Sequence, residues 1–232
     1  MVGNSSQFGA YNVDVCLVID KTGSMAPIIN TVKRNALNLY RDVLDSLENK
    51  GKHVSQFRIR VIWFGDYIAD SVPMLLSDFL KMPDDLSKYE EFVKSIKPDG
   101  GGDAPEDGLE ALTYAIRSDW VKTGWRKRHI IALFTDAPSH ELGFGKKSPS
   151  YPKHGMPEDF GQLSEMWGSK AYPAEMDNSA KRLLLFAPDT SFWHTIKECW
   201  NNVVLSPAGE STGLEDIAYQ YMINTIVNSV LL

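Results

Sequence analysis

The chain has 232 residues, of which 43% are hydrophobic and 23% are charged, and its formal net charge is −6. This is the balance of an ordinary soluble globular domain, and an acidic charge without a long basic run argues against nucleic-acid binding. No segment reaches the roughly 20 consecutive apolar residues that a membrane-spanning helix needs. The first residues, MVGNSSQFGAYN, lack the basic start and apolar middle of a signal peptide.

Buried-looking apolar runs alternate with segments of helical periodicity, which predicts a mostly parallel sheet covered by helices on both faces. The expected strands are 13–19, 57–64, 129–135, 182–187 and 203–205, and 67–76 could return as an antiparallel edge. The expected helices are 27–47, 86–96, 109–118, 157–167, 192–200 and 214–231. We therefore predict one doubly wound α/β domain over residues 1–232.

The two cysteines, Cys16 and Cys199, are too few and too isolated for a disulfide framework. Cys16 lies in the first expected strand and Cys199 in an expected helix. Because an unpaired cysteine usually behaves as a small buried hydrophobe, we expect two free, packed thiols. Free thiols favour a cytoplasmic location.

Residues from about 138 to 180 interrupt the alternation and are rich in Pro, Gly, Ser and aromatic residues. A stretch of about 40 residues is longer than a usual connection, so we interpret it as an insertion. It follows Asp136 directly, and we expect it to border the end of that strand. Its aromatic side chains could form a recognition surface or pack against their own domain. They are Phe144, Tyr151, Phe160, Trp167 and Tyr172. We predict that this segment shapes what can bind, and that deletion of residues 145–178 abolishes partner binding while sparing the fold.

Three carboxylates are expected at one edge of the sheet. Asp20 ends the first strand in VCLVIDKTGSM, Asp136 ends another, and Asp103 follows three glycines. In open α/β sheets, ligands bind beyond the carboxyl ends of the strands. If the two strands are neighbours, the carboxylates converge and a cation would relieve their repulsion. Carboxylate and hydroxyl oxygens, including those of Thr22 and Ser24, suit Mg²⁺, Ca²⁺ or Mn²⁺.

Three motifs in order, DKTGSM, GGGDAPEDGLEAL and ALFTDAPSH, resemble a von Willebrand factor A domain with its metal-ion-dependent adhesion site, in the GGGDxPE variant. The resemblance covers nearly the whole chain and implies a Rossmann-like fold. It implies that Asp20, Thr22, Ser24 and Asp103 are the nearer ligands of Mg²⁺ (or Ca²⁺ or Mn²⁺), and that Asp136 binds directly or through water. It further implies a metal-dependent protein-binding module, within a multiprotein assembly, rather than an enzyme.

Asp103 departs from the many family members that carry threonine at this position. A divalent ion facing three ionised aspartates leaves the site negative, so the site should attract a partner's carboxylate less and hold the metal more tightly. We expect a hydroxyl or carbonyl as the partner's ligand, or a metal kept mainly for structure. Asp103 could also cap a helix, because DAPE resembles a capping box, and the two roles can coexist.

The DKTGS loop also resembles the phosphorylated DKTGT loop of P-type ATPases and haloacid-dehalogenase relatives, and GDYIAD at 65–70 resembles a metal motif of that superfamily. This alternative makes the chain a phosphohydrolase with Asp20 as nucleophile. Chain order argues against it, because only one expected helix separates Asp20 from Asp66. Asp66 is then either a solvated strand end or a supporting partner of the metal site. His140 could reach that site, although such a histidine is more often a surface or packing residue.

Overall fold

The computed structural model describes residues 9–100, 105–168, 175–207 and 219–231. The helices are α1 (Ala26–Glu48), α2 (Leu86–Ser95), α3 (Gly108–Ile116), α4 (Phe160–Trp167), α5 (Ser191–Cys199) and α6 (Tyr219–Leu231), with 3₁₀ turns η2 (Gly23–Met25) and η3 (Phe144–Lys147). The strands are β1 (Tyr11–Asp20), β2 (Val54–Phe64), β3 (Met74–Leu76), β4 (Leu80–Met82), β5 (Arg126–Phe134), β6 (Lys181–Ala187) and β7 (Val203–Pro207).

The described strands form one sheet in the order β3-β2-β1-β5-β6-β7, with β4 also paired to β2. β1, β2, β5, β6 and β7 are parallel, whereas β3 and β4 run antiparallel to β2. The predicted mostly parallel sheet and its antiparallel edge are therefore confirmed, and β4 is an addition. Because β1 lies between β2 and β5, the carboxyl ends of the first strand and of the strand before Asp136 are neighbours. That residues 1–232 form a single domain stays a prediction.

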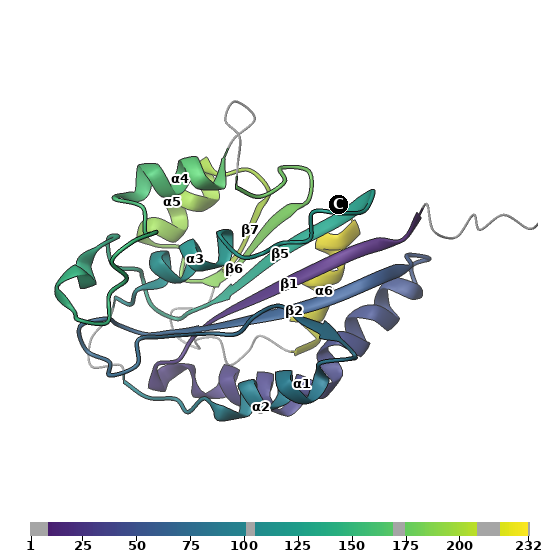
Figure 1. The fold of residues 1–232 in the computed structure, drawn as a ribbon, viewed down its shortest axis with the longest axis horizontal. Helices are drawn as coiled ribbons and strands as arrows, with labels where there is room; N and C mark the ends of the chain where they lie inside the picture. Colours follow the sequence, from purple (N-terminus) through teal and green to yellow (C-terminus); the bar gives the residue numbers. More distant parts are fainter. Residues whose placement is uncertain (1–8, 101–104, 169–174, 208–218, 232) are drawn as a thin grey trace, which may run out of the picture.

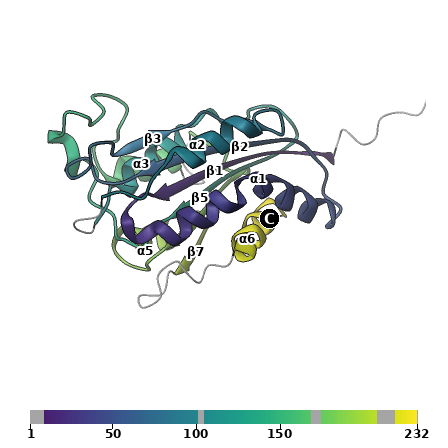
Figure 2. The ribbon, with the colours of Figure 1, turned by 90° about the horizontal axis from the view of Figure 1, so that it is seen from below.

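Helices cover both faces of the sheet (Figures 1 and 2). Val13, Val15, Leu17 and Ile19 of β1 pack into a core with α1, α2 and α6. Cys16 and Val18 point the other way, into a second core with α3, α4 and α5. This two-sided burial explains why β1 reads as a continuous apolar run rather than an alternating one. Within the described residues, no helix has the length and apolar character to cross a membrane.

The insertion is part of the second core. Leu163 and Trp167 of α4 are fully buried there, and Met176 is nearly so. Phe160 packs against the same core and Tyr151 is buried, whereas Phe144 is 51% exposed. Tyr172 lies outside the described residues. Because deletion of residues 145–178 would remove Leu163 and Trp167 from the core, we now expect it to destabilise the fold, against the prediction from sequence.

The two cysteines differ in environment. Cys16 is a free, buried thiol, as predicted, and burial raises its pKa to about 12. Cys199 is free but exposed, so the prediction of a packed thiol is wrong there. The buried stripe at α5 consists of Trp193, Ile196 and Trp200, and Cys199 lies off this stripe at the last turn.

Gly108, the first residue of α3, lies against the buried indole of Trp193. A Cβ at this position would be 2.7 Å from Cζ2 of Trp193. We expect Gly108→Ala to lower the free energy of unfolding by about 1–2 kcal/mol, because an added methyl overpacks the second core. Urea denaturation measures this. Gly9→Ala is the matched control, because a Cβ at Gly9 meets nothing within 4 Å. An unchanged midpoint for Gly108→Ala would contradict the tight packing.

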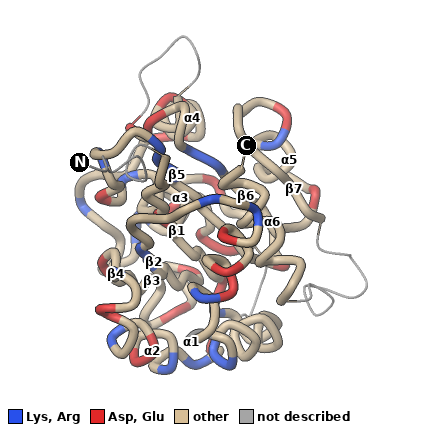
Figure 3. Tube along the Cα trace, turned by 90° about the vertical axis from the view of Figure 1, so that its right-hand side faces the viewer, with Lys and Arg blue, Asp and Glu red and all other residues tan. Residues whose placement is uncertain are grey.

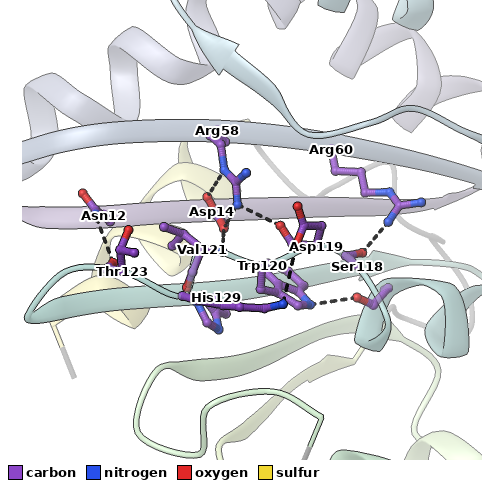
Figure 4. A network of polar contacts seen from close by, with 12 residues as sticks. Asn12, Asp14, Arg58, Arg60, Ser118, Asp119, Trp120, Val121, Thr123 and His129 are labelled. Carbon is purple, nitrogen blue, oxygen red and sulfur yellow. Dashed lines mark hydrogen bonds and ion pairs between the residues drawn. The ribbon is translucent and has the colours of Figure 1, made fainter.

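The parallel strands begin at the end of the molecule that faces the viewer in Figure 3. Near this end, an ion pair between the buried Asp14 and the partly buried Arg58 joins β1 to β2 (Figure 4). Arg58 donates to both carboxylate oxygens of Asp14, at 2.8 and 2.6 Å. The same carboxylate accepts the backbone N–H of Val121 at 2.7 Å, and Arg58 also donates to the Asp119 carbonyl at 2.9 Å. The network therefore anchors the connection between α3 and β5 to the sheet.

Candidate functional site

Asp20 is the last residue of β1 and lies in the middle of the sheet edge, fully buried. Its Oδ1 accepts from the Thr22 backbone N–H at 2.8 Å and from the Thr22 hydroxyl at 2.6 Å. Its Oδ2 accepts from the Thr135 hydroxyl at 2.8 Å. Aspartate favours such bonds to the backbone two residues on. These contacts from two chain segments fix the orientation of the carboxylate.

Thr22 and Ser24 place their hydroxyl oxygens beside Asp20. Thr22 is buried, Ser24 is exposed, and their Oγ atoms are 3.4 Å apart. The 3₁₀ turn η2 (Gly23–Met25) changes the direction of the chain between β1 and α1. The residues of DKTGS thus bring one carboxylate and two hydroxyls together at a single turn.

Thr135 and Asp136 follow β5, the neighbour of β1. Thr135 is buried and donates to Asp20, whereas Asp136 is partly exposed. The pKa of Asp20 is raised to about 6, chiefly by burial and to a smaller extent by the charge of Asp136, against the lowering effect of hydrogen bonds from Thr22 and Thr135. Asp136 is therefore close enough to act on Asp20. Thr135 was not among the predicted site residues, and its signal in the sequence is a hydroxyl between a buried strand and a carboxylate.

Asp103 lies outside the described residues, so its expected place at the edge of the sheet stays a prediction. Glu106, three residues later, is described and buried, and its Oε2 has no hydrogen-bond partner among the described residues. Burial raises the pKa of Glu106 to about 9, and repulsion from Asp20 is the next cause, followed by Asp70 and Asp66. The Glu106 carboxyl group thus belongs to the same acidic edge as Asp20.

The described helix does not support the alternative in which DAPE, which ends at Glu106, forms a capping box. α3 begins at Gly108, and the Glu106 backbone N–H donates to the Pro138 carbonyl at 3.1 Å. Glu106 and Ser139 form a parallel β-bridge beyond the strand ends. The segment before α3 is therefore held against the segment after β5, which brings the glutamate to the sheet edge.

Lys21 does not neutralise Asp20. Its Nζ lies 3.0 Å from Oδ2 of Asp70, and both side chains are buried. The same Asp70 oxygen accepts the Asp66 backbone N–H at 2.9 Å. A Cβ on Gly65 would collide with this carboxylate, so the ion pair requires glycine there. In the GDYIAD loop, which resembles a phosphohydrolase metal motif, Asp70 therefore forms an ion pair with Lys21.

His140 and Asp66 connect the insertion to the loop after β2. Nε2 of His140 lies 3.1 Å from Oδ2 of Asp66, and both side chains are buried. The His140 ring stacks on Phe144 with ring centres 3.8 Å apart. Asp66 is therefore a buried partner rather than a solvated strand end. Asp66 lies in the same loop as Asp70, so the contact between His140 and Asp66 supports this loop.

The oxygen atoms of Asp20, Asp136 and Glu106 suit a hard cation once the hydroxyl oxygens of Thr22 and Ser24 are included. No three His, Cys, Asp or Glu side chains in the described part of the chain are arranged to hold a metal. Asp103 lies outside that part, and threonine and serine are not among those four types. Oε2 of Glu106 is buried near Asp20 and has no hydrogen-bond partner among the described residues. A divalent cation would supply a partner for this oxygen.

Comparison with known proteins assigns the family. The family model for the von Willebrand factor A domain matches residues 14–143, more than half of the chain. The chain belongs to the von Willebrand factor A domain family. The matched segment includes the DKTGS loop, the GDYIAD loop and Asp136, so the family match places both motifs of the phosphohydrolase alternative in a von Willebrand factor A domain.

Curated relatives share part of this domain. An ariadne-like RING finger protein of Acanthamoeba polyphaga mimivirus is 29% identical over 130 residues, covering 55% of this chain and 11% of the relative. The alpha-protein kinase vwkA of Dictyostelium discoideum is 25% identical over 140 residues (60% and 21%). Integrin beta-6 of Homo sapiens is 25% identical over 156 residues (56% and 18%). This von Willebrand factor A domain therefore spans only a small part of the relatives it matches.

A solved structure supports the fold. The pilus adhesin SpaC from Lactobacillus rhamnosus GG, in an open conformation, superposes with a TM-score of 0.52 at 13% identity, covering 97% of this chain and 30% of that one. At this identity the similarity concerns the fold alone. It agrees with the mostly parallel, helix-covered sheet described above.

Proposed function

We propose that this von Willebrand factor A domain is a protein-binding module whose binding depends on a divalent metal at the carboxyl ends of β1 and β5. The observation that carries the proposal is the buried Asp20 carboxylate, which lies near Asp136 and Glu106 and has no cationic partner among the described side chains. Lys21, its neighbour in sequence, is paired with Asp70, and His140 is paired with Asp66.

Asp20, Thr22, Ser24 and Asp136 are the proposed ligands, with Asp103 from the sequence and Glu106 as an addition. Their hard oxygen atoms favour Mg²⁺, Ca²⁺ or Mn²⁺ over zinc. The bound ion would supply positive charge and an open coordination position for an oxygen of the partner. Since the site already holds several carboxylates, we expect that oxygen to be a hydroxyl or a carbonyl.

Exposed apolar side chains in the same loops support an interaction role. Phe144, stacked on His140, is 51% exposed, and Ile68, two residues after Asp66, is 58% exposed. Large exposed apolar residues beside a polar site are typical of recognition surfaces. The similarity to integrin beta-6 and the family membership favour such a role over catalysis. A protein partner within a multiprotein assembly, and a cytoplasmic location suggested by the free thiols, remain part of this proposal.

The proposal is tested by Mn²⁺ titration calorimetry on the wild type and on Asp20→Asn. We expect the variant to lose at least tenfold in metal affinity, because a neutral amide replaces a central carboxylate ligand. Asp84→Asn is the matched control, since Asp84 is exposed and its ion pair, with Lys81 at 2.9 Å, lies on the surface. Equal affinity of wild type and Asp20→Asn would contradict the metal site. A partner captured by the wild type should be released by chelator, and a chelator-resistant complex would contradict metal-dependent binding.

A further inference from the structure

Three arginines gather at the end of the sheet opposite the candidate metal site. Arg126 and Arg128 lie at the start of β5, and Arg182 is the second residue of β6. The register pairs Arg126 with Tyr11, and Arg182 with Ile130, whose side chain packs in the α6-side core. Because side chains alternate along a strand, all three arginines point to the face that α6 covers. This end faces the viewer in Figure 3, with arginine and lysine positions in blue.

The three guanidinium groups lie close to one another. The guanidinium carbons of Arg126 and Arg128 are each 5.4 Å from the centre of the Tyr11 ring. Burial lowers the pKa of Arg182, and repulsion from Arg128 lowers it further. Burial likewise lowers the pKa of Arg128, with a smaller contribution from Arg126. Two of the guanidinium groups therefore share one aromatic ring, and the third is within electrostatic reach of Arg128.

Only carbonyl oxygens satisfy these arginines among the described residues. Arg128 donates to the carbonyls of Val230 and Lys127, each at 2.9 Å, and Arg126 to that of Gly9 at 3.4 Å. Arg182 donates through Nη1 to the carbonyls of Lys181 at 2.7 Å and Ser179 at 3.3 Å. No carboxylate in the described part of the chain forms an ion pair with any of the three.

Two cationic side chains of neighbouring segments differ from this cluster in having acidic partners. Nearby cations are paired, Arg117 with Glu175 at 3.2 Å and Lys127 with Asp177 at 3.0 Å. The chain as a whole is acidic, with a net charge of −6. Asp177 lines the same pocket as Arg126 and Arg128 but is paired with Lys127. Three like charges without an ion pair of their own repel one another, and an anion would offset this repulsion. A guanidinium group offers five donors, and most of those on Arg126 and Arg182 are not used by the contacts above.

We propose that Arg126, Arg128 and Arg182 form a binding site for a tetrahedral oxyanion, namely a phosphoryl group. The planar donor fork of arginine matches phosphate oxygens, and several guanidinium groups around one phosphate are a recurrent arrangement. Trp125, immediately before Arg126, is 87% exposed. The phosphoryl group can therefore come from a soluble phosphate or from a lipid headgroup, where an exposed tryptophan also inserts.

Thermal unfolding in inorganic phosphate tests the site. We expect about 50 mM phosphate to raise the Tm of the wild type by about 3 °C relative to chloride at equal ionic strength. Arg126→Gln/Arg182→Gln should lose most of this shift. Arg128 is kept, because it donates to a carbonyl in the last turn of α6 and its replacement would destabilise the helix end. Arg34→Gln/Arg41→Gln, on the exposed side of α1, is the matched control. A shift absent from the wild type, or equal in all three proteins, overturns the proposal.

Vesicle sedimentation distinguishes the two sources of phosphate. Binding to phosphatidylglycerol vesicles but not to phosphatidylcholine vesicles, lost in Arg126→Gln/Arg182→Gln and in Trp125→Ala, would identify a lipid headgroup. A phosphate-dependent Tm shift without vesicle binding would identify a soluble phosphate. Circular dichroism verifies that the double variant is folded, and the single variants Arg126→Lys and Arg182→Lys provide a second measurement if it is not. A lysine variant that keeps the full shift would contradict recognition by the guanidinium fork.

Discussion

Replacing Asp14 by alanine is expected to lower the free energy of unfolding by about 3 kcal/mol, the lower end of the range for breaking a buried ion pair, because Asp14 is fully buried and Arg58 only partly. Asp14 is fully buried and accepts two hydrogen bonds from Arg58 and one from the Val121 backbone N–H. Removing the carboxylate leaves the Arg58 charge without its partner and one backbone donor without an acceptor. Equilibrium unfolding in guanidinium chloride measures the loss.

Two comparison variants separate this effect from a general surface effect. Asp84→Ala removes an exposed ion pair with Lys81 and should change stability by less than about 0.5 kcal/mol. Asp14→Leu/Arg58→Met removes both charges. Its loss in free energy of unfolding should be smaller than the sum of the losses for Asp14→Leu and Arg58→Met, because neither charge is left unpaired. A loss below about 1 kcal/mol for Asp14→Ala would contradict the anchoring role of this network.

In the presence of chelator, the Tm is expected to fall as the pH rises from about 5 to about 9. The folded-state pKa is about 6 for Asp20, about 7 for Asp107 and about 9 for Glu106, each above its ordinary value near 4, with burial as the first cause. The native state therefore retains protons that the unfolded chain has lost. Stability is greatest below the unfolded pKa values and is lost as the pH rises through the folded ones.

Magnesium should reverse this loss, and most strongly at the alkaline end. Metal binding requires the deprotonated carboxylates, so Mg²⁺ competes with protons. At a hundredfold excess over its Kd, the ion would stabilise the protein by about 2.7 kcal/mol. For a chain of this size, this corresponds to a Tm increase of about 5–10 °C near pH 8 and little change near pH 5. Differential scanning fluorimetry at several pH values, with Mg²⁺ or chelator, measures both effects.

The control variants define the contribution of the site. Asp20→Asn should lose the Mg²⁺-dependent increase in Tm, whereas Asp84→Asn should behave as the wild type does, because Asp84 lies on the surface. An equal response to Mg²⁺ at pH 5 and at pH 9, or a full response in Asp20→Asn, would show that the ion acts elsewhere.

Much of the architecture was predictable because its signals are local. β1, β2, β5 and β6 were predicted within a few residues of their observed bounds, since each carries an uninterrupted apolar run. Such runs are typical of strands buried on both faces, and here they lie between two cores. The DKTGS turn was likewise predictable, because its contacts join residues two positions apart in sequence.

The acidic partners of Asp20 were harder to predict, because tertiary contacts position them. Glu106 reaches the edge only because its segment bridges to Ser139 after β5. Lys21 could have neutralised Asp20, its neighbour in sequence, but pairs with Asp70 from a different loop. For the insertion, the aromatic composition left recognition and packing both open, and only the tertiary structure shows that Leu163 and Trp167 fill a core with α3 and α5.

By itself, the sequence determined a parallel sheet covered on both faces and an oxygen-rich turn after its first strand. Periodic burial and short-range hydrogen bonding operate over a few residues, and a linear pattern records them. Only the tertiary structure decided which charges meet: Glu106 near Asp20, Lys21 on Asp70, and three arginines together at the opposite end. Electrostatic interactions depend on distances between strands and loops that are far apart in the chain, and these distances exist only once the sheet has formed.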